Sequence, residues 1–348
     1  MLYPKIRWAF RSLIRAKVTI GLAISGFPKR RNVLSLESFQ DRIPALNDEI
    51  YLEEKIFDGH STTMNEHSLK NSENIAKNWS CFPLYLRVLK NSSINFPYSI
   101  IYLKKSKKYL FEFSWGWGKY RTMAIGKFNR FISKKITSDY PVFLFCGSGY
   151  HGLIEDLPIV LILLERGANF TLAYDSRDKW TKGLIDFFVP EDVNLVEIND
   201  EVWVTSERFV VASKSIFGEF IHKELPLMLN SYVKKFNLEE LKPRKIFIKR
   251  GNKSRRYNTN EQNYIETYQK KGYEIVSLED LSISDQISLF YNAKKVVGFH
   301  GAGLTNIVWS RFDLELTELY TLDHFNSCYS SLCESLNFKY SNFEVSKN

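Results

Sequence analysis

Apolar and polar positions repeat most regularly in the last third of the chain. Residues 244–249 alternate in the manner of a strand, and residues 295–297 form another short apolar strand. Between them, residues 284–293 carry apolar side chains at the spacing of a helix with one buried face. We also expect a helix from residue 261 to about 271 and a strand over 273–277. Because strands and helices alternate, this region predicts a doubly wound α/β unit.

The middle of the chain shows a second alternation of the same kind. Strands are predicted over residues 141–146, 169–174, 193–198 and 208–212, and helices over 151–166, 179–188 and 217–236. The last of these helices would cross between the two units. Residues before 96 show few strand signals. We therefore expect three parts: a basic amphipathic segment with a polar extension (1–95), an α/β domain (96–225) and a second α/β domain (226–348).

A glycine turn follows the strand at residues 295–297. Gly298 ends the apolar run, and His300 precedes Gly301, Ala302 and Gly303. Residues 304–309 can then continue as a helix with Leu304, Ile307 and Val308 on one face. The unpaired N–H groups of a helix start form an anion site, and glycines let a phosphate approach the backbone. His300 would point into that site.

Several motifs occur in a fixed order around this turn. They are Arg250, Arg256 with Asn258-x-x-Glu261, Leu281-Ser-x-x-x-Gln286, Gly298-x-His300-Gly-Ala-Gly-Leu-Thr-Asn306, and Glu318-Leu319. Upstream lies Tyr150-His151-x-x-x-Glu155-Asp156. Over residues 140–320 the chain resembles glycosyltransferase family 61. The resemblance implies a GT-B-like α/β fold, with two Rossmann-type domains facing across a cleft, the first on the acceptor side and the second binding a nucleotide-sugar.

The resemblance also implies a donor site without a metal. The chain has no Asp-x-Asp motif of the kind that holds a nucleotide diphosphate through a divalent ion, and we expect no cofactor. Backbone N–H groups and arginines must then neutralise the departing diphosphate. Glu318 is expected to bind ribose hydroxyls, and Thr305 or Asn306 to cap the helix or touch phosphate. The predicted donor-binding residues are Arg250, Arg256, His300, Gly301, Ala302, Gly303, Thr305, Asn306 and Glu318.

A general base is expected in the first α/β domain. Inverting transfer needs a base in line with the anomeric carbon to activate an acceptor hydroxyl. His151 and Glu155 are four residues apart on a predicted helix and share a face, and Asp156 is their neighbour. We predict that one of these three is the base. The alternative is that His151 orients the loop and Glu155 caps a helix or forms a salt bridge.

Composition limits the remaining possibilities. A chain of 348 residues that is 44% hydrophobic is long enough for two domains with cores of their own. The four cysteines, Cys81, Cys146, Cys328 and Cys333, show neither zinc-type spacing nor a paired framework. We expect free thiols in a reducing compartment.

Basic residues are concentrated in two stretches. Residues 1–36 contain eight Lys or Arg and no Asp or Glu, mixed with apolar residues, which predicts binding to an anionic membrane surface through residues 1–31. A solvated or domain-packing helix and a targeting segment are the alternatives. Residues 104–135 contain ten Lys or Arg, one Glu and interleaved aromatics. Packed aromatics with a solvated lysine face explain that stretch better than nucleic acid, for which no motif is present.

Together these features predict a metal-independent inverting glycosyltransferase, a hexosyl- or pentosyltransferase. It would move a sugar from a nucleotide-sugar, by default a UDP-sugar, to a hydroxyl of a glycan or lipid-linked glycan. The product would be a bacterial capsule or lipopolysaccharide, made at the inner face of the cytoplasmic membrane. The alternative is a non-catalytic nucleotide- or polyanion-binding protein, or a membrane-scaffolding component of an envelope polysaccharide assembly complex.

Overall fold

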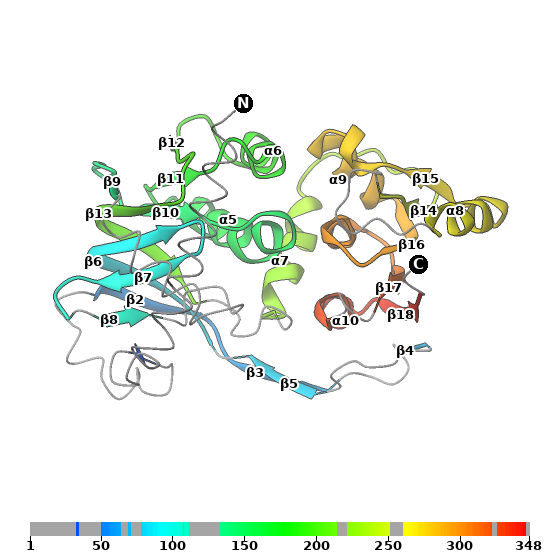
Figure 1. The fold of residues 1–348 in the computed structure, drawn as a ribbon, viewed down its shortest axis with the longest axis horizontal. Coiled ribbons are helices and arrows are strands. Elements are labelled where there is room, and N and C mark those ends of the chain that lie inside the picture. Colours follow the sequence, from blue (N-terminus) through cyan, green and yellow to red (C-terminus); the bar gives the residue numbers. More distant parts are fainter. Residues whose placement is uncertain are drawn as a thin grey trace, which may run out of the picture.

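The structure is a computed structural model. It describes residues 33–34, 50–63, 69–70, 78–81, 83–106, 108–110, 133–213, 221–250, 260–321 and 326–345. Arg256, the basic segment 1–31 and most of the basic stretch 104–135 lie outside the described residues. Within them the chain is a mixed α/β protein with a ten-stranded and a six-stranded sheet, which lie side by side with α5 and α7 between them (Figure 1).

The ten-stranded sheet has the strand order β1-β8-β7-β6-β13-β10-β11-β12, with β2 paired to β6 and β9 to β13. Its strands are β1 (Val33–Leu34), β2 (Ile50–Phe57), β6 (Leu84–Phe96), β7 (Ile100–Leu103), β8 (Lys108–Leu110), β9 (Ser133–Lys135), β10 (Val142–Phe145), β11 (Thr171–Tyr174), β12 (Asn194–Glu197) and β13 (Val202–Ala212). Strands β13, β10, β11 and β12 are parallel, whereas β6 pairs antiparallel with β13.

The six-stranded sheet has the order β15-β14-β16-β17-β18-β4 and is parallel throughout. Its strands are β14 (Arg244–Ile248), β15 (Glu274–Val276), β16 (Ala293–Phe299), β17 (Glu315–Tyr320), β18 (Lys339–Glu344) and β4 (Leu69–Lys70). A separate two-stranded sheet consists of β3 (His60–Thr63) and β5 (Asn78–Cys81). Strand β4 is far from the others in sequence, so the second sheet also draws on the N-terminal part of the chain.

The helices follow the strands in alternation. They are α4 (Gly149–His151), the π-helical turn η4 (Gly152–Asp156), α5 (Leu157–Glu165), α6 (Lys179–Phe188), α7 (Glu224–Val233), α8 (Glu261–Lys270), the 3-10 turn η5 (Leu278–Asp280), α9 (Ile283–Tyr291), the 3-10 helix η6 (Ala302–Trp309) and α10 (Cys328–Ser335). Side chains cap two of them: Asp178 accepts from the N–H of Trp180, and Ser282 from that of Asp285. No described helix is both long and apolar enough to cross a bilayer.

Each sheet reverses its strand order at one point. In the second sheet the chain runs from β14 to β15 on one side and then returns to β16 on the other. In the first sheet it runs from β10 to β11 and β12 and then returns to β13, on the far side of β10. Ligands of open α/β sheets bind outside the carboxyl ends of strands at such a reversal. A ligand site is therefore expected at the carboxyl ends of β10, β14 and β16.

One apolar core joins the two sheets. It contains buried residues of α5, α7, β14, η6 and α10, so helices of both halves pack on one another. Phe188 of α6 stacks on Trp309 of η6, with ring centroids 5.6 Å apart. A smaller cluster on the opposite face of the second sheet places Phe247 against Tyr268 of α8. These contacts hold the carboxyl ends of the two sheets in one arrangement.

The sequence-based elements are confirmed in the two α/β regions, with four differences. The strand predicted over 208–212 is longer, since β13 spans Val202–Ala212. The predicted helix over 151–166 is interrupted by the π-helical turn η4, and the helix after the glycine turn is 3-10 rather than α. The helix over 217–236 is shorter, since α7 spans Glu224–Val233. The reading of few strands before residue 96 was wrong, because β6 is a 13-residue strand buried between β7 and β13.

Candidate functional site

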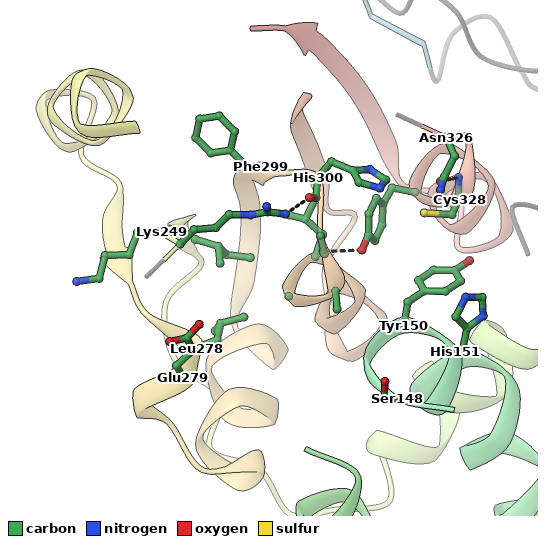
Figure 2. Close-up of a pocket in the computed structure, with 17 residues that line it drawn as sticks. Ser148, Tyr150, His151, Lys249, Leu278, Glu279, Phe299, His300, Asn326 and Cys328 are labelled. Atoms are coloured by element: carbon green, nitrogen blue, oxygen red, sulfur yellow. Dashed lines mark hydrogen bonds between the residues drawn. The ribbon is translucent and has the colours of Figure 1, made fainter. Parts of the chain in front are cut away.

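A cleft of about 570 Å³ lies where the carboxyl ends of the two sheets meet (Figure 2). The first half contributes Tyr150 and His151, which follow β10. The second half contributes Arg250 after β14, His300 after β16, and the turn at residues 301–303. The cleft therefore lies at the strand reversals of both sheets, as expected for a ligand site in this kind of fold.

Arg250 and His300 are held against each other on the second wall. The Arg250 guanidinium donates to the His300 carbonyl, and the backbone N–H of Arg250 donates to the Glu261 carboxylate at 2.7 Å. Gly301 has extended backbone angles, so strain does not explain the glycine. The lack of space explains it, because a Cβ at position 301 would collide with the Arg250 guanidinium. Glycine at 301 thus lets an arginine lie flat against the turn.

The turn presents backbone amides to the cleft. The N–H of Leu304 donates to the Gly301 carbonyl at 3.0 Å, which is the first hydrogen bond of η6. The N–H groups of Ala302 and Gly303 come before it and so have no intrahelical partner. The Tyr329 hydroxyl donates to the same Gly301 carbonyl at 2.5 Å and so helps to fix the turn. Two amides beside a guanidinium are a suitable arrangement for an anionic group.

Glu318 lies behind His300 and not on the cleft wall. Its side chain is fully buried; one carboxylate oxygen contacts Nδ1 of His300, and the other accepts from the Tyr340 hydroxyl at 2.5 Å. The expected ribose contact does not fit this geometry, because both oxygens already bind protein groups. A carboxylate that accepts from Nδ1 fixes the proton on that nitrogen and turns Nε2 away from the carboxylate. Glu318 therefore orients the imidazole.

Thr305 and Asn306 also lie beneath the turn, where both are buried and neither lines the cleft. The Asn306 amide donates to the Gly303 carbonyl at 3.3 Å and to the Gln286 side chain at 3.2 Å, and its oxygen accepts from Trp309. A phosphate contact by Asn306 therefore does not fit the structure. The asparagine fixes the start of η6, which is the capping type of role that the sequence left open.

On the first wall, only one of the three predicted base candidates faces the cleft. His151 lines it and is about one third exposed, with Nδ1 3.4 Å from a buried oxygen of Glu155. Asp156 is fully buried and accepts the N–H groups of Cys146 and Gly147 at 2.9 and 2.6 Å. Asp156 therefore cannot reach an acceptor, and it holds the turn after β10. Glu155 supports His151 from behind.

Glu155 and Asp156 both belong to the π-helical turn η4. Such turns are rare and often occur at functional sites, because the wider turn changes which side chains share a face. Here the two neighbouring carboxylates have separate tasks, one beside His151 and one at the Gly147 backbone. The sequence predicted that His151 and Glu155 share a face, but no local pattern indicated the change from α-helix to π-helix.

The cleft contains residues that the sequence analysis did not select. Tyr150, Tyr329, Ser148 and Lys249 line it but were not among the predicted site residues. The pattern Gly147-x-Gly149-x-x-Gly152 directly after β10 was a usable signal for the first wall, since such spacing marks a tight turn between strand and helix. No sequence signal pointed to Tyr329, because this residue belongs to α10, which is distant in sequence from the other cleft residues. Among the described residues, no group of three or more His, Cys, Asp or Glu is arranged to hold a metal ion.

The site thus combines a glycine turn, an arginine and a carboxylate-supported histidine at the strand reversals of an α/β chain, where ligands of such sheets bind. The family model described as Glycosyltransferase 61 matches residues 118–317, more than half of the chain. The chain therefore belongs to glycosyltransferase family 61. Membership implies glycosyltransferase activity, with a sugar donor and an acceptor. The comparison with curated proteins finds no match.

Proposed function

We propose that the protein is a metal-independent inverting glycosyltransferase of GT-B architecture that uses a nucleotide-sugar, by default a UDP-sugar. The observation that carries the proposal is the opposition of two histidines across one cleft, each supported by a buried carboxylate. His300 with Glu318 lies on the wall of the glycine turn, and His151 with Glu155 lies on the other wall. Residues 96–225 would then form the acceptor-side domain and residues 226–348 the donor domain.

The diphosphate of the donor would bind at the glycine turn. The amides of Ala302 and Gly303 and the Arg250 guanidinium would stabilise the charge that develops as the bond to the sugar weakens. Arg250 suits this task because its contact with the His300 carbonyl holds it in place before the ligand arrives. His300 would contact the diphosphate or the donor sugar, and its orientation would come from Glu318. Arg256 is a further candidate from the sequence.

The acceptor hydroxyl would be activated by His151. In the proposed step, the acceptor oxygen forms a bond to the anomeric carbon while its proton passes to the imidazole. The bond from that carbon to the diphosphate oxygen breaks, and the diphosphate leaves with the electron pair. Attack from the side opposite the leaving group inverts the anomeric centre. Glu155 would stabilise the protonated imidazole from 3.4 Å, so His151 is the group we assign as base.

For the biological setting, we propose a glycan or lipid-linked glycan acceptor in the synthesis of a bacterial capsule or lipopolysaccharide. The protein would work at the inner face of the cytoplasmic membrane. The support is the excess of Lys and Arg among residues 1–36, which would attract an anionic membrane surface. A flotation experiment with anionic and neutral vesicles, with and without residues 1–31, tests this part separately.

The donor site is tested by thermal denaturation with a panel of nucleotides and nucleotide-sugars, each with and without EDTA. A ligand that binds the folded state raises the melting temperature. We expect one nucleoside diphosphate and its sugar to stabilise the protein equally with and without EDTA, and His300→Ala and Arg250→Ala to lose the effect. Arg177→Ala and His60→Gln are the control variants, because neither residue lines the cleft.

Three outcomes would redirect the proposal. No stabilisation by any nucleotide would remove the donor-site assignment and favour the membrane-scaffolding alternative. Stabilisation with neither transfer to a glycan acceptor nor hydrolysis of the sugar would favour a non-catalytic binding protein. Loss of stabilisation in EDTA would contradict the metal-independent mechanism but leave the donor site in place.

A further inference from the structure

Tyr150 belongs to a row of four rings that line the cleft. Its ring meets that of Tyr329 edge to face, with centroids 5.8 Å apart, and that of His151 at 5.4 Å. Tyr329 in turn meets His300 edge to face at 5.4 Å. The row therefore connects the histidines of the two walls, and Tyr150 is its member from the first half.

The hydroxyls of the two tyrosines differ in their partners. Tyr329 donates to the Gly301 carbonyl. The Tyr150 hydroxyl is buried and, among the described residues, has no hydrogen-bond partner, although the residue is only 8% exposed and lines the cleft. Buried polar groups are nearly always paired, because an unpaired one loses its hydration without compensation. An unpaired hydroxyl in a substrate cleft therefore calls for a ligand partner.

The ligand partner must accept a hydrogen bond. Burial raises the pKa of the Tyr150 hydroxyl well above its ordinary value, so the group stays protonated and can donate at neutral pH. Figure 2 shows the ring extending from the helix start towards Cys328, on the His151 side of the row. The Tyr150 side chain thus lies beside the proposed base, His151.

We propose that the Tyr150 hydroxyl donates a hydrogen bond to a hydroxyl oxygen of the sugar being transferred. This inference rests on the proposed function, in which the diphosphate occupies the glycine turn and the acceptor lies at His151. The transferred sugar lies between those two groups, as Tyr150 does between His151 and Tyr329. A buried donor that is left unpaired by the wrong sugar discriminates more strongly than an apolar contact, so Tyr150 determines donor specificity.

The test compares wild type, Tyr150→Phe and the control Tyr140→Phe, which removes a hydroxyl from an exposed tyrosine. Binding of UDP, UDP-glucose, UDP-galactose, UDP-xylose and UDP-N-acetylglucosamine is measured by calorimetry. For Tyr150→Phe we expect UDP affinity within about twofold of wild type and affinity for the preferred UDP-sugar about 5- to 10-fold lower. The melting temperature without ligand should be unchanged or higher, because the substitution removes an unpaired buried hydroxyl.

Deoxy analogues of the preferred UDP-sugar identify the sugar hydroxyl. Wild type should bind one analogue about 5- to 10-fold more weakly than the parent sugar, and Tyr150→Phe should bind that analogue and the parent equally. Such a pattern arises only if the two hydroxyls contact each other. Tyr140→Phe should behave as wild type throughout.

Other results would overturn the assignment. Equal weakening of UDP and UDP-sugar would place Tyr150 at the diphosphate. Unchanged donor binding with a raised KM for the acceptor would place it at the acceptor, and unchanged binding with a lower melting temperature would make the hydroxyl structural. If wild type bound none of the nucleotide-sugars, the proposed function would fail and this inference with it. Binding by wild type that Tyr150→Phe leaves intact overturns the inference alone.

Discussion

Gly149 and Ala302 lie against each other where the turn after β10 meets the turn after β16. A Cβ built on Gly149 would lie 2.9 Å from the Cβ of Ala302, and Gly149 has φ +55, in the left-handed region. The turn after β10 and the turn after β16 can approach this closely because position 149 has no side chain. This contact fixes the separation of the two walls, and therefore of His151 from His300.

We expect Gly149→Ala to lower both stability and activity. The left-handed backbone costs an alanine about 1–2 kcal/mol, and the contact with Ala302 adds about 1–3 kcal/mol of overpacking. Urea unfolding measures the sum. Activity should fall further than stability explains, because pushing the walls apart misplaces the base relative to the donor.

Gly167→Ala is the matched control for this substitution, since Gly167 has φ +63 and nothing within 4 Å of the added Cβ. It should show the backbone cost alone. Adding Ala302→Gly to Gly149→Ala should recover the packing part of the loss and leave the backbone part. If Gly149→Ala and Gly167→Ala destabilise equally, the contact between the two turns carries no strain and this account is wrong.

Glu318→Gln should weaken donor binding and keep the fold. The amide can replace the carboxylate in shape, but it no longer fixes the proton on Nδ1 of His300 or accepts fully from Tyr340. We expect a 10- to 100-fold loss of kcat/KM, on the order found when groups that orient a functional histidine are removed. Tyr340→Phe is the comparison, because it removes the other partner of Glu318 and leaves the contact with His300. A greater loss in Tyr340→Phe would contradict an orienting role.

His151→Ala should lower the turnover rate and leave the affinity for the donor unchanged. Loss of a general base lowers kcat by about 10²- to 10⁴-fold. UDP should still bind within about twofold of wild type, because the proposed diphosphate site lies on the other wall. Glu155→Gln should reduce kcat less, by about tenfold, since the imidazole remains. Single-turnover kinetics with saturating donor measures these effects, and an unchanged rate in His151→Ala would remove His151 from the mechanism.

A pair of histidines that does not line the cleft should make stability depend on pH. The pKa of His60 lies at about 4, lowered by burial and then by the neighbouring His222, and burial also lowers the pKa of His222. Their rings meet edge to face with centroids 4.9 Å apart. The unfolded chain takes up these protons near pH 6.5, before the folded chain does. The stabilisation is therefore complete above pH 6.5 and is lost as pH falls towards 4.

Urea midpoints at pH 7, 6 and 5 test this dependence. We expect His60 to account for about 1 kcal/mol of the loss, a value reduced for solvent screening of a partly exposed group. In His60→Gln that share of the slope should disappear, whereas His151→Gln should keep it. Parallel pH curves for wild type and His60→Gln would show that this pair is not responsible.

The elements of both α/β regions could be predicted because periodicity is a local property. The strand after residue 244, the helix that ends near 270 and the turn at Gly301 are all visible in short windows of sequence. The ordered motifs identified the family, and the helical spacing of His151 and Glu155 predicted their contact. Gly301, Ala302 and Gly303 belong to one loop, so their common position needed no tertiary information.

Tertiary structure decided the tasks of side chains that look alike in sequence. Asp156 is next to Glu155, yet it binds the turn after β10, and Glu318 lies behind His300 because parallel strands β16 and β17 are neighbours. Residues 84–96 have weak strand signals but form β6, because they lie between β7 and β13 in the first sheet. A central strand is specified by its neighbours as much as by its own residues. Tyr329 reaches the site through the packing of α10. The sequence determined which local structures form, and only the packing of distant segments determined which side chains meet in the cleft.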